Sequence, residues 1–143
     1  MTKVSDKENK EQELQQKLML YQLLQRQLEE LQKQATMLQA RFTEIEASRI
    51  ALEDVDKVEK GNELLIPIGS GVYARGSAQK GDVLVDAGAG IMTEKSPAEA
   101  LGIMETKKKE LEVMGSKLQQ EILSVAGKMN EIGVEMEKVL QEK

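Results

Sequence analysis

Two short segments in the middle of the chain contain residues that could bind phosphate. Residues 69–74 read Gly-Ser-Gly-Val-Tyr-Ala and fit the relaxed dinucleotide pattern G-x-G-x-x-A, in which a glycine turn opens a helix facing a pyrophosphate. Here the β-forming Val72 and Tyr73 follow the glycines, so the segment predicts a turn between strands. Residues 94–96 resemble the end of a phosphate loop, but Glu94 would place a carboxylate beside the phosphates. We therefore expect no nucleotide or other cofactor at either place.

The amino-acid composition also argues against catalysis. The chain has no Cys, His or Trp, one Phe and two Tyr, so it lacks the commonest nucleophile, general base and soft metal ligand. We expect a protein that is not an enzyme, with no catalytic residues and no metal site.

Charge and hydropathy limit the partners. The formal net charge is -5, whereas non-specific binding to nucleic acid requires Lys and Arg to displace counterions. Residues 1–12 are polar and charged, and no apolar run approaches the roughly 18 residues of a membrane span. We expect a soluble, cytoplasmic protein that binds neither nucleic acid nor membrane.

Two long segments carry apolar residues at alternating spacings of three and four. This period is typical of helices packed along a coiled-coil seam. Almost all seam positions are apolar in both segments. The first seam comprises Leu14, Lys17, Tyr21, Leu24, Leu28, Leu31, Ala35, Leu38, Phe42, Ile45, Arg49 and Leu52, and the second comprises Leu101, Met104, Lys108, Leu111, Gly115, Leu118, Ile122, Val125, Met129, Ile132, Met136 and Val139.

The matched lengths predict an antiparallel pair in which Leu14 faces Val139. The first helix is expected from near Glu11 to about Lys60, with Gly61-Asn62 as its stop. The second is expected to open at residues 96–99, with Ser96 as N-cap, Pro97 in the first turn and Glu99 closing a capping box.

Three charged residues interrupt the seams: Lys17, Arg49 and Lys108. They could fix the register of the two helices, or they could extend their charged ends to solvent along aliphatic stems. We favour the second interpretation.

The segment between the helices predicts two β-hairpins. Residues 64–68 and 72–76 flank one glycine turn, and residues 82–86 and 91–94 flank another. Pro67 cannot donate a ladder hydrogen bond, which places its strand at an edge or beside a bulge. The fold class is α+β, with a tail and first helix in residues 1–60, the hairpins in 61–95 and the second helix in 96–143.

Such short hairpins cannot bury an apolar face alone, and their edges leave backbone groups unpaired. We expect them to complete a sheet or barrel with hairpins of other subunits. The predicted oligomerisation residues are Leu65, Ile66, Ile68, Val83, Leu84 and Val85.

The hairpin segment carries a family resemblance. Residues 65–71, 82–90 and 94–96, with Glu99-Ala100 following, resemble the α-type subunits of the archaeal prefoldin family. This resemblance implies a hexamer of two α and four β subunits, with a β-barrel platform and six coiled coils. It also implies an ATP-independent chaperone that captures non-native client protein and transfers it to a group II chaperonin.

Apolar residues beyond the seam's needs gather near both ends of the chain. Met19, Leu23 and Val134 fall where a two-helix coil faces water, which indicates binding. Leu18, Leu20 and Leu140 could equally belong to a wider packing stripe, and Met129 and Met136 could add an adaptable surface. The predicted client-binding residues are Leu18, Met19, Leu20, Leu23, Met129, Val134, Met136 and Leu140.

Two other functions fit the same pattern. A structural coiled-coil tether or adaptor would bind defined partners through its ends. A helical co-chaperone could act as a nucleotide-exchange factor for a partner ATPase.

Overall fold

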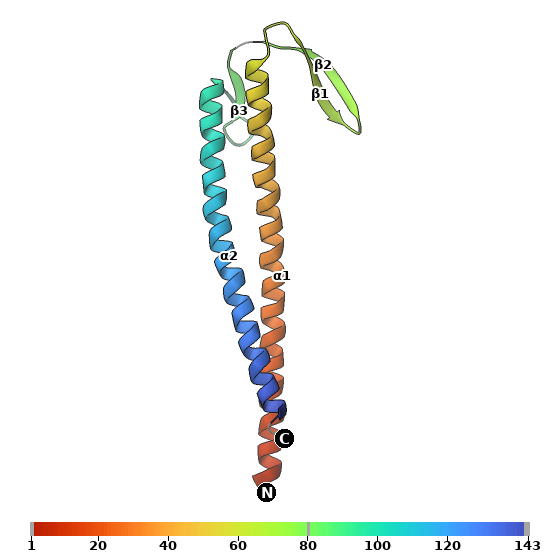
Figure 1. Ribbon diagram of the computed structural model, residues 1–143, viewed down its shortest axis with the longest axis vertical. Coiled ribbons are helices and arrows are strands. Elements are labelled where there is room, and N and C mark those ends of the chain that lie inside the picture. Colours follow the sequence, from red (N-terminus) through yellow and green to blue (C-terminus); the bar gives the residue numbers. More distant parts are fainter. Residues whose placement is uncertain (1, 80, 142–143) are drawn as a thin grey trace. The chain divides into compact units, whose positions relative to one another are not determined.

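The computed structural model describes residues 2–79 and 81–141, and it contains two long helices and four short strands (Figure 1). Residues 1, 80, 142 and 143 lie outside the described residues. The sequence assigns them to the N-terminal tail, the hairpin segment and the second helix. This architecture confirms the predicted α+β class. The elements are α1 (Thr2–Lys57), β1 (Glu63–Gly69), β2 (Val72–Ser77), β3 (Val83–Asp86), β4 (Met92–Lys95) and α2 (Pro97–Gln141).

Helix α1 is displaced at both ends from the sequence expectation. It begins at Thr2 rather than near Glu11, so the helix extends about two and a half turns beyond the predicted start. It ends at Lys57 rather than about Lys60. Gly61, with a φ of 90°, lies in the following turn, and its N–H donates to the Ala78 carbonyl at 2.8 Å. Gly61 therefore starts the hairpin segment instead of capping the helix.

The start of α2 agrees with its predicted cap. The helix begins at Pro97, and the Ser96 Oγ accepts a hydrogen bond from the Glu99 backbone N–H at 3.1 Å. This bond satisfies one of the free donors of the first helical turn.

The chain forms two compact units. Unit 1 contains the described residues up to Gln39 and from Glu112 onward, and unit 2 contains Ala40–Leu111. Both units include parts of α1 and α2, and the hairpins belong to unit 2.

The main buried core lies in unit 1. Tyr21, Leu28, Ala35, Leu38, Ile122, Met129 and Met136 pack partly buried around it. All of these positions belong to the predicted seams, so the coiled-coil period is confirmed here. The buried core residues are Leu24, Leu31, Leu118, Val125 and Ile132.

Two ion pairs between the helices agree with the predicted register. In that register Lys17 faces Met136, and its observed partner is the neighbouring Glu135 at 2.7 Å in unit 1. Glu46 would face Lys107, and its observed partner is Lys108 at 2.9 Å in unit 2. The helices are therefore antiparallel within each unit.

The seam of unit 2 is less buried than that of unit 1. Phe42, Ile45, Leu101 and Leu111 are half-buried, and in the described part of unit 2 only Ala78 and Ala100 are buried. A two-helix pair with so few enclosed side chains leaves much of its apolar area in contact with solvent.

Both hairpins are antiparallel two-stranded sheets, as predicted. The β1–β2 register shifts between Pro67 and Gly69, which is the irregularity expected beside this proline. In the β3–β4 hairpin, Leu84 pairs with Glu94, and the connecting turn contains Ala89 with a φ of 52°. The glycine-rich segments are hairpin turns rather than helix openings, as their sequence indicated.

The buried seam of unit 1 predicts a contrast between two leucines of α2. Leu118 is 7% exposed and Leu123 is 62% exposed. Leu118→Ala should lower the free energy of unfolding by about 2–4 kcal/mol, because it leaves a cavity between the helices. Urea unfolding followed by circular dichroism measures the change.

Leu123→Ala is the matched control and should change the free energy of unfolding by less than about 0.5 kcal/mol. Equal losses in the two variants would contradict the assignment of Leu118 to the core.

Candidate functional site

An apolar surface lies on the outside of the helices in unit 1. Met19 is 70% exposed, Leu23 is 61% exposed and Val134 is 44% exposed. Met129 and Met136 are half-buried and pack against the core. Of the predicted client-binding residues, those the structure exposes are Leu18, Met19, Leu20, Leu23, Val134 and Leu140, and we call this set the unit 1 apolar surface.

Two hollows open on this part of unit 1. The first has a volume of about 410 Å³ and lies on α1 alone. The second, the interhelical hollow, has a volume of about 380 Å³ and has walls from both helices. The first is lined by Met19, Leu20, Gln22, Leu23 and Arg26, and the interhelical hollow is lined by Tyr21, Leu28, Ala126, Met129, Asn130, Gly133, Val134 and Glu137.

A second apolar surface lies on the hairpins of unit 2. Among the predicted oligomerisation residues, Val83 and Val85 are half-buried, and the others are exposed. Alternation along β3 explains the difference, since Leu84 points to the face opposite Val83 and Val85. The exposed predicted residues are Leu65, Ile66, Ile68 and Leu84.

The sequence reasoning missed four exposed apolar residues, which lie on β2, in the second hairpin turn and on β4. Applying the period of two to the second strand of each hairpin could have found one residue of each adjacent pair. Together with the exposed predicted residues they form the hairpin apolar surface. The missed residues are Val72, Tyr73, Ile91 and Met92.

Lys17 forms an ion pair across the helices of unit 1. Its Nζ donates to Glu135 at 2.7 Å and lies 3.7 Å from Glu13. The hydrogen bond to Glu135 raises the pKa of Lys17 above its ordinary value of 10.5, against a smaller opposing effect of burial. The contact joins the two helices, and the Lys17 side chain keeps about a fifth of its surface in solvent. Both interpretations given for the seam cations, a contact that fixes the register and a charged end that reaches solvent, therefore fit Lys17.

A cluster of charges centred on Glu46 lies in unit 2. Glu46 contacts Lys108 at 2.9 Å and Arg49 at 3.1 Å, and Arg49 also binds Glu53 at 3.0 Å. The Lys108 Nζ lies 5.6 Å from the Phe42 ring centroid. Hydrogen bonds from Lys108 and then Arg49 hold the pKa of Glu46 below its ordinary value of 4.5. Both seam cations in this cluster therefore have carboxylate partners.

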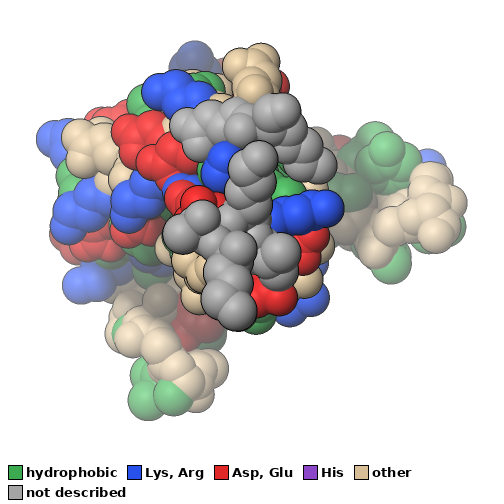
Figure 2. Space-filling model, turned by 90° about the horizontal axis from the view of Figure 1, so that it is seen from below, with side chains coloured by type: hydrophobic (Ala, Val, Ile, Leu, Met, Phe, Trp, Pro, Cys, Tyr) green, Lys and Arg blue, Asp and Glu red, His purple; other side chains and the backbone are tan. Residues whose placement is uncertain are grey.

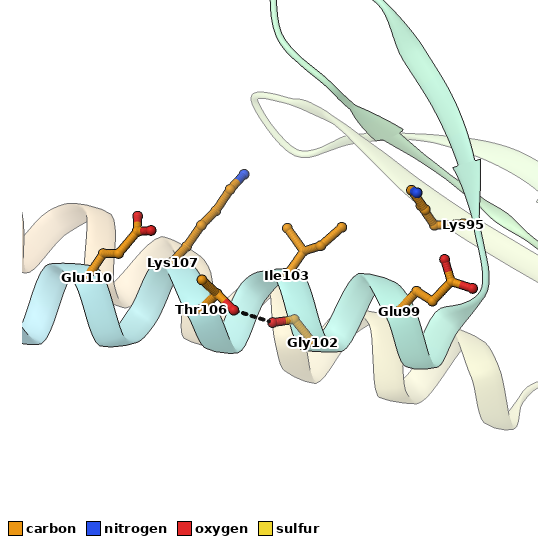
Figure 3. Close-up of a pocket in the computed structure, with 7 residues that line it drawn as sticks. All are labelled: Lys95, Glu99, Gly102, Ile103, Thr106, Lys107 and Glu110. Carbon is orange, nitrogen blue, oxygen red and sulfur yellow. Dashed lines mark hydrogen bonds between the residues drawn. The ribbon is translucent and has the colours of Figure 1, made fainter.

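A third hollow, of about 540 Å³, lies beside the first turns of α2 in unit 2 (Figure 3). Ile103 and Lys107 project from α2 toward it, and Lys95 approaches from the end of β4. Thr106 uses its hydroxyl to donate to the Gly102 carbonyl at 3.1 Å. The exposed Glu99 carboxylate also lines this hollow, which combines charges of both signs without a nucleophile and base pair.

The described surfaces carry mixed charge. Figure 2 shows Lys and Arg side chains interspersed with Asp and Glu over the helices. Within residues 2–79 and 81–141, no group of three or more acidic side chains is placed to hold a metal ion. Over the same residues, neither long helix has a stretch apolar enough to span a lipid bilayer.

These features define a class of protein. Antiparallel helices with a coiled-coil seam and exposed apolar residues outside it, joined by two hairpins with open edges, belong to the class of coiled-coil subunits.

The comparison with known families gives the particular one. The profile of the family Prefoldin, described as "Prefoldin subunit", matches residues 24–142. The chain therefore belongs to the prefoldin family.

Curated relatives agree with this assignment. The chain is 31% identical over 113 residues to a "Prefoldin subunit alpha" of Thermofilum pendens, covering 78% of this chain and 88% of the relative. It is 29% identical over 123 residues to a "Prefoldin subunit alpha" of Pyrococcus horikoshii, covering 85% and 83%. As a member of this family, the chain is a chaperone subunit of the α type.

Solved structures share the fold. A cryo-EM structure of filamentous PFD from Methanocaldococcus jannaschii matches with a TM-score of 0.71 and 25% identity, covering 80% of this chain and 96% of that one. The prefoldin beta subunit from Thermococcus strain KS-1 matches with a TM-score of 0.60 and 16% identity, covering 90% and 92%. The second likeness concerns the fold alone.

The Glu46 cluster predicts a pH dependence of stability. Because the folded-state pKa of Glu46 is lowered, its contribution is present above about 4.5 and is lost as the pH falls through the folded-state pKa. The difference in free energy of unfolding between the parent and Glu46→Gln should therefore shrink between about pH 7 and about pH 3. Urea unfolding at both pH values measures it.

Glu44→Gln, an exposed neighbour on α1, is the control and should show a smaller difference from the parent at either pH. A parent-to-Glu46→Gln difference that stays constant or grows on acidification would contradict the role of the cluster.

Proposed function

We propose that this chain is the α-type subunit of an ATP-independent holdase, in which two α and four β subunits form a hexamer. The complex captures non-native protein on the unit 1 apolar surface and passes it to a group II chaperonin in the cytoplasm. It acts without catalysis, metal or cofactor. The observation that carries this proposal is the exposure of Met19, Leu23 and Val134 at positions where a plain two-helix coil would be polar.

The hairpins support assembly through unit 2. The β1–β2 and β3–β4 sheets each have only two strands, so both edges of each sheet carry unpaired backbone groups. Leu65, Ile68 and Leu84 are largely exposed in the single chain. Strands and apolar side chains of other subunits would cover both features.

The unit 1 apolar surface supports capture of non-native chains. Such chains expose apolar segments without a fixed geometry, and a shallow surface of Leu and Met adapts to them better than a rigid pocket. The hollow on α1 and the interhelical hollow both include residues of this surface.

A filament is a second candidate for the assembly. The similar solved structure of TM-score 0.71 is a filamentous PFD, and open sheet edges can pair copies of one chain as well as different chains. The native mass of this chain, measured with and without a β-type subunit, separates a closed hexamer from a growing filament.

The tether and the nucleotide-exchange factor are distinguished by their binding behaviour. A tether binds one defined partner with saturable stoichiometry, and an exchange factor accelerates nucleotide release from an ATPase. A holdase instead suppresses aggregation of unrelated denatured proteins.

The assembly proposal predicts the effect of a charge on the hairpin apolar surface. Leu65→Glu and Leu84→Glu together should reduce the native mass of the complex, because each carboxylate would be buried at a subunit contact. The helicity should be retained, since both residues lie in strands. Analytical ultracentrifugation and circular dichroism measure the two quantities.

Met37→Glu is the control, because Met37 and Leu65 are both 64% exposed. It should leave the native mass unchanged. If the hairpin double variant also assembles normally, the hairpin apolar surface does not mediate oligomerisation.

The capture proposal predicts a loss of protection when the unit 1 apolar surface becomes polar. Met19, Leu23 and Val134 should be replaced together by Ser in the assembled complex. The variant should suppress aggregation of a denatured client at least about threefold less well, because apolar contact area is lost. Light scattering with and without ATP measures the protection, which should not depend on ATP.

A matched control replaces Met37, Ile50 and Val113 by Ser, which are exposed apolar residues outside the predicted set. It should protect the client as the parent does. If both triple variants protect the client equally well, Met19, Leu23 and Val134 do not form the client-binding region. If protection by the parent strictly requires ATP, the holdase function is refuted.

A further inference from the structure

The two sides of the helix pair in unit 1 differ in character. Gly133 and Glu135 are two residues apart on α2, so they point about 200° apart and flank the seam on opposite sides. On the Glu135 side, the 2.7 Å contact with Lys17 joins the helices. On the Gly133 side, the interhelical hollow opens. An ion pair spans the two helices on the Glu135 side, whereas a hollow lies between them on the Gly133 side.

Small side chains create the opening. Ala126 and Gly133 lie seven residues apart on α2, on the same side of the helix, and both line the hollow. A Cβ added at Gly133 would meet nothing within 4 Å, so the space above this residue is free.

The inner wall of the hollow consists of seam residues. Tyr21, Leu28 and Met129 pack half-buried against the core, and each also lines the hollow. A larger residue at 133 would cover part of this apolar wall, because helical side chains lean toward the preceding turn, where Met129 lies. The glycine leaves core side chains open to an incoming group.

The interhelical hollow shares one residue, Val134, with the unit 1 apolar surface. Val134 stands at its edge and is exposed. Tyr21 and Leu28 of α1 and Met129 and Val134 of α2 line the hollow, so an apolar group in it would contact apolar side chains of both helices.

The charge at the edge of the interhelical hollow is negative. Glu137 is the single charged residue among the described residues that line it. A carboxylate at the edge of an apolar site favours a partner that carries Lys or Arg beside its apolar side chain.

We propose that the interhelical hollow is a one-sided client subsite. It takes a large apolar side chain of an extended non-native polypeptide, with a Lys or Arg of the same segment next to Glu137. This inference rests on the proposed holdase function and adds to it the side of the coil and the chemical class of segment that binds.

The first test fills the hollow. Gly133→Gln should weaken binding of a labelled peptide about tenfold, because the new side chain occupies the space of the client's apolar group. The peptide contains Leu, Ala and Ser with Lys at both ends. Fluorescence anisotropy with the assembled complex measures its affinity. Folding is not at risk, since Gln has a higher helix propensity than Gly.

Gly127→Gln is the matched control. Gly127 lies on the same helix, does not line the hollow, and also has nothing within 4 Å of an added Cβ. It should bind the peptide as the parent does. If Gly133→Gln and Gly127→Gln bind the peptide equally well, the subsite proposal is overturned. If the parent complex binds no peptide and protects no client, both the subsite and the holdase function are overturned.

The second test concerns charge. Glu137→Gln should weaken binding of the Lys-flanked peptide about two- to threefold and leave binding of a Glu-flanked version unchanged or slightly stronger. The preference of the parent for the Lys-flanked peptide should decline in high salt. Glu131→Gln, which makes the same charge change away from the hollow, is the control.

Two results would contradict the proposal. An equal affinity of the parent for the Lys-flanked and Glu-flanked peptides would remove the basic preference. A concentration-dependent self-association that Gly133→Gln abolishes would assign the hollow to a second copy of this chain instead of a client.

Discussion

The buried seam between α1 and α2 in unit 1 is the interaction on which the structure depends. Leu24 and Leu31 pack with Leu118, Val125 and Ile132 as its enclosed layer, and the remaining seam residues surround this layer half-buried. A pair of helices has no third layer to cover its outer surfaces. The seam therefore stabilises the helices of unit 1 and leaves the described apolar residues outside it in that unit in contact with solvent.

This constraint explains how a chaperone subunit can keep apolar side chains exposed in its folded state. Met19 and Leu23 cannot be buried by the two-helix pair, so their exposure persists in the folded state of the single chain. Glycine contributes in a second way, because Gly133 leaves the half-buried Tyr21 and Met129 open at the interhelical hollow. In the proposed holdase, the binding surface is thus produced by positions outside the seam and by a missing side chain beside it.

Unit 2 also leaves apolar side chains exposed, but on hairpins as well as on helices. Its seam side chains remain half-buried, and its charges are organised around Glu46, which contacts both Lys108 and Arg49. The hairpins have open edges and an apolar surface that includes Leu65 and Leu84. Exposure of this kind in a single subunit is what assembly with other subunits would remove.

The sequence by itself determined the helices, the seam, the hairpins and the family resemblance, because each depends on local period, caps and turn glycines. Ser96 and Pro97 marked the start of α2, and Pro67 marked the irregular strand. Only the tertiary structure decided which side chains become covered. It exposed Leu84 while half-burying Val83, since burial depends on the neighbouring strand and not on the residue type.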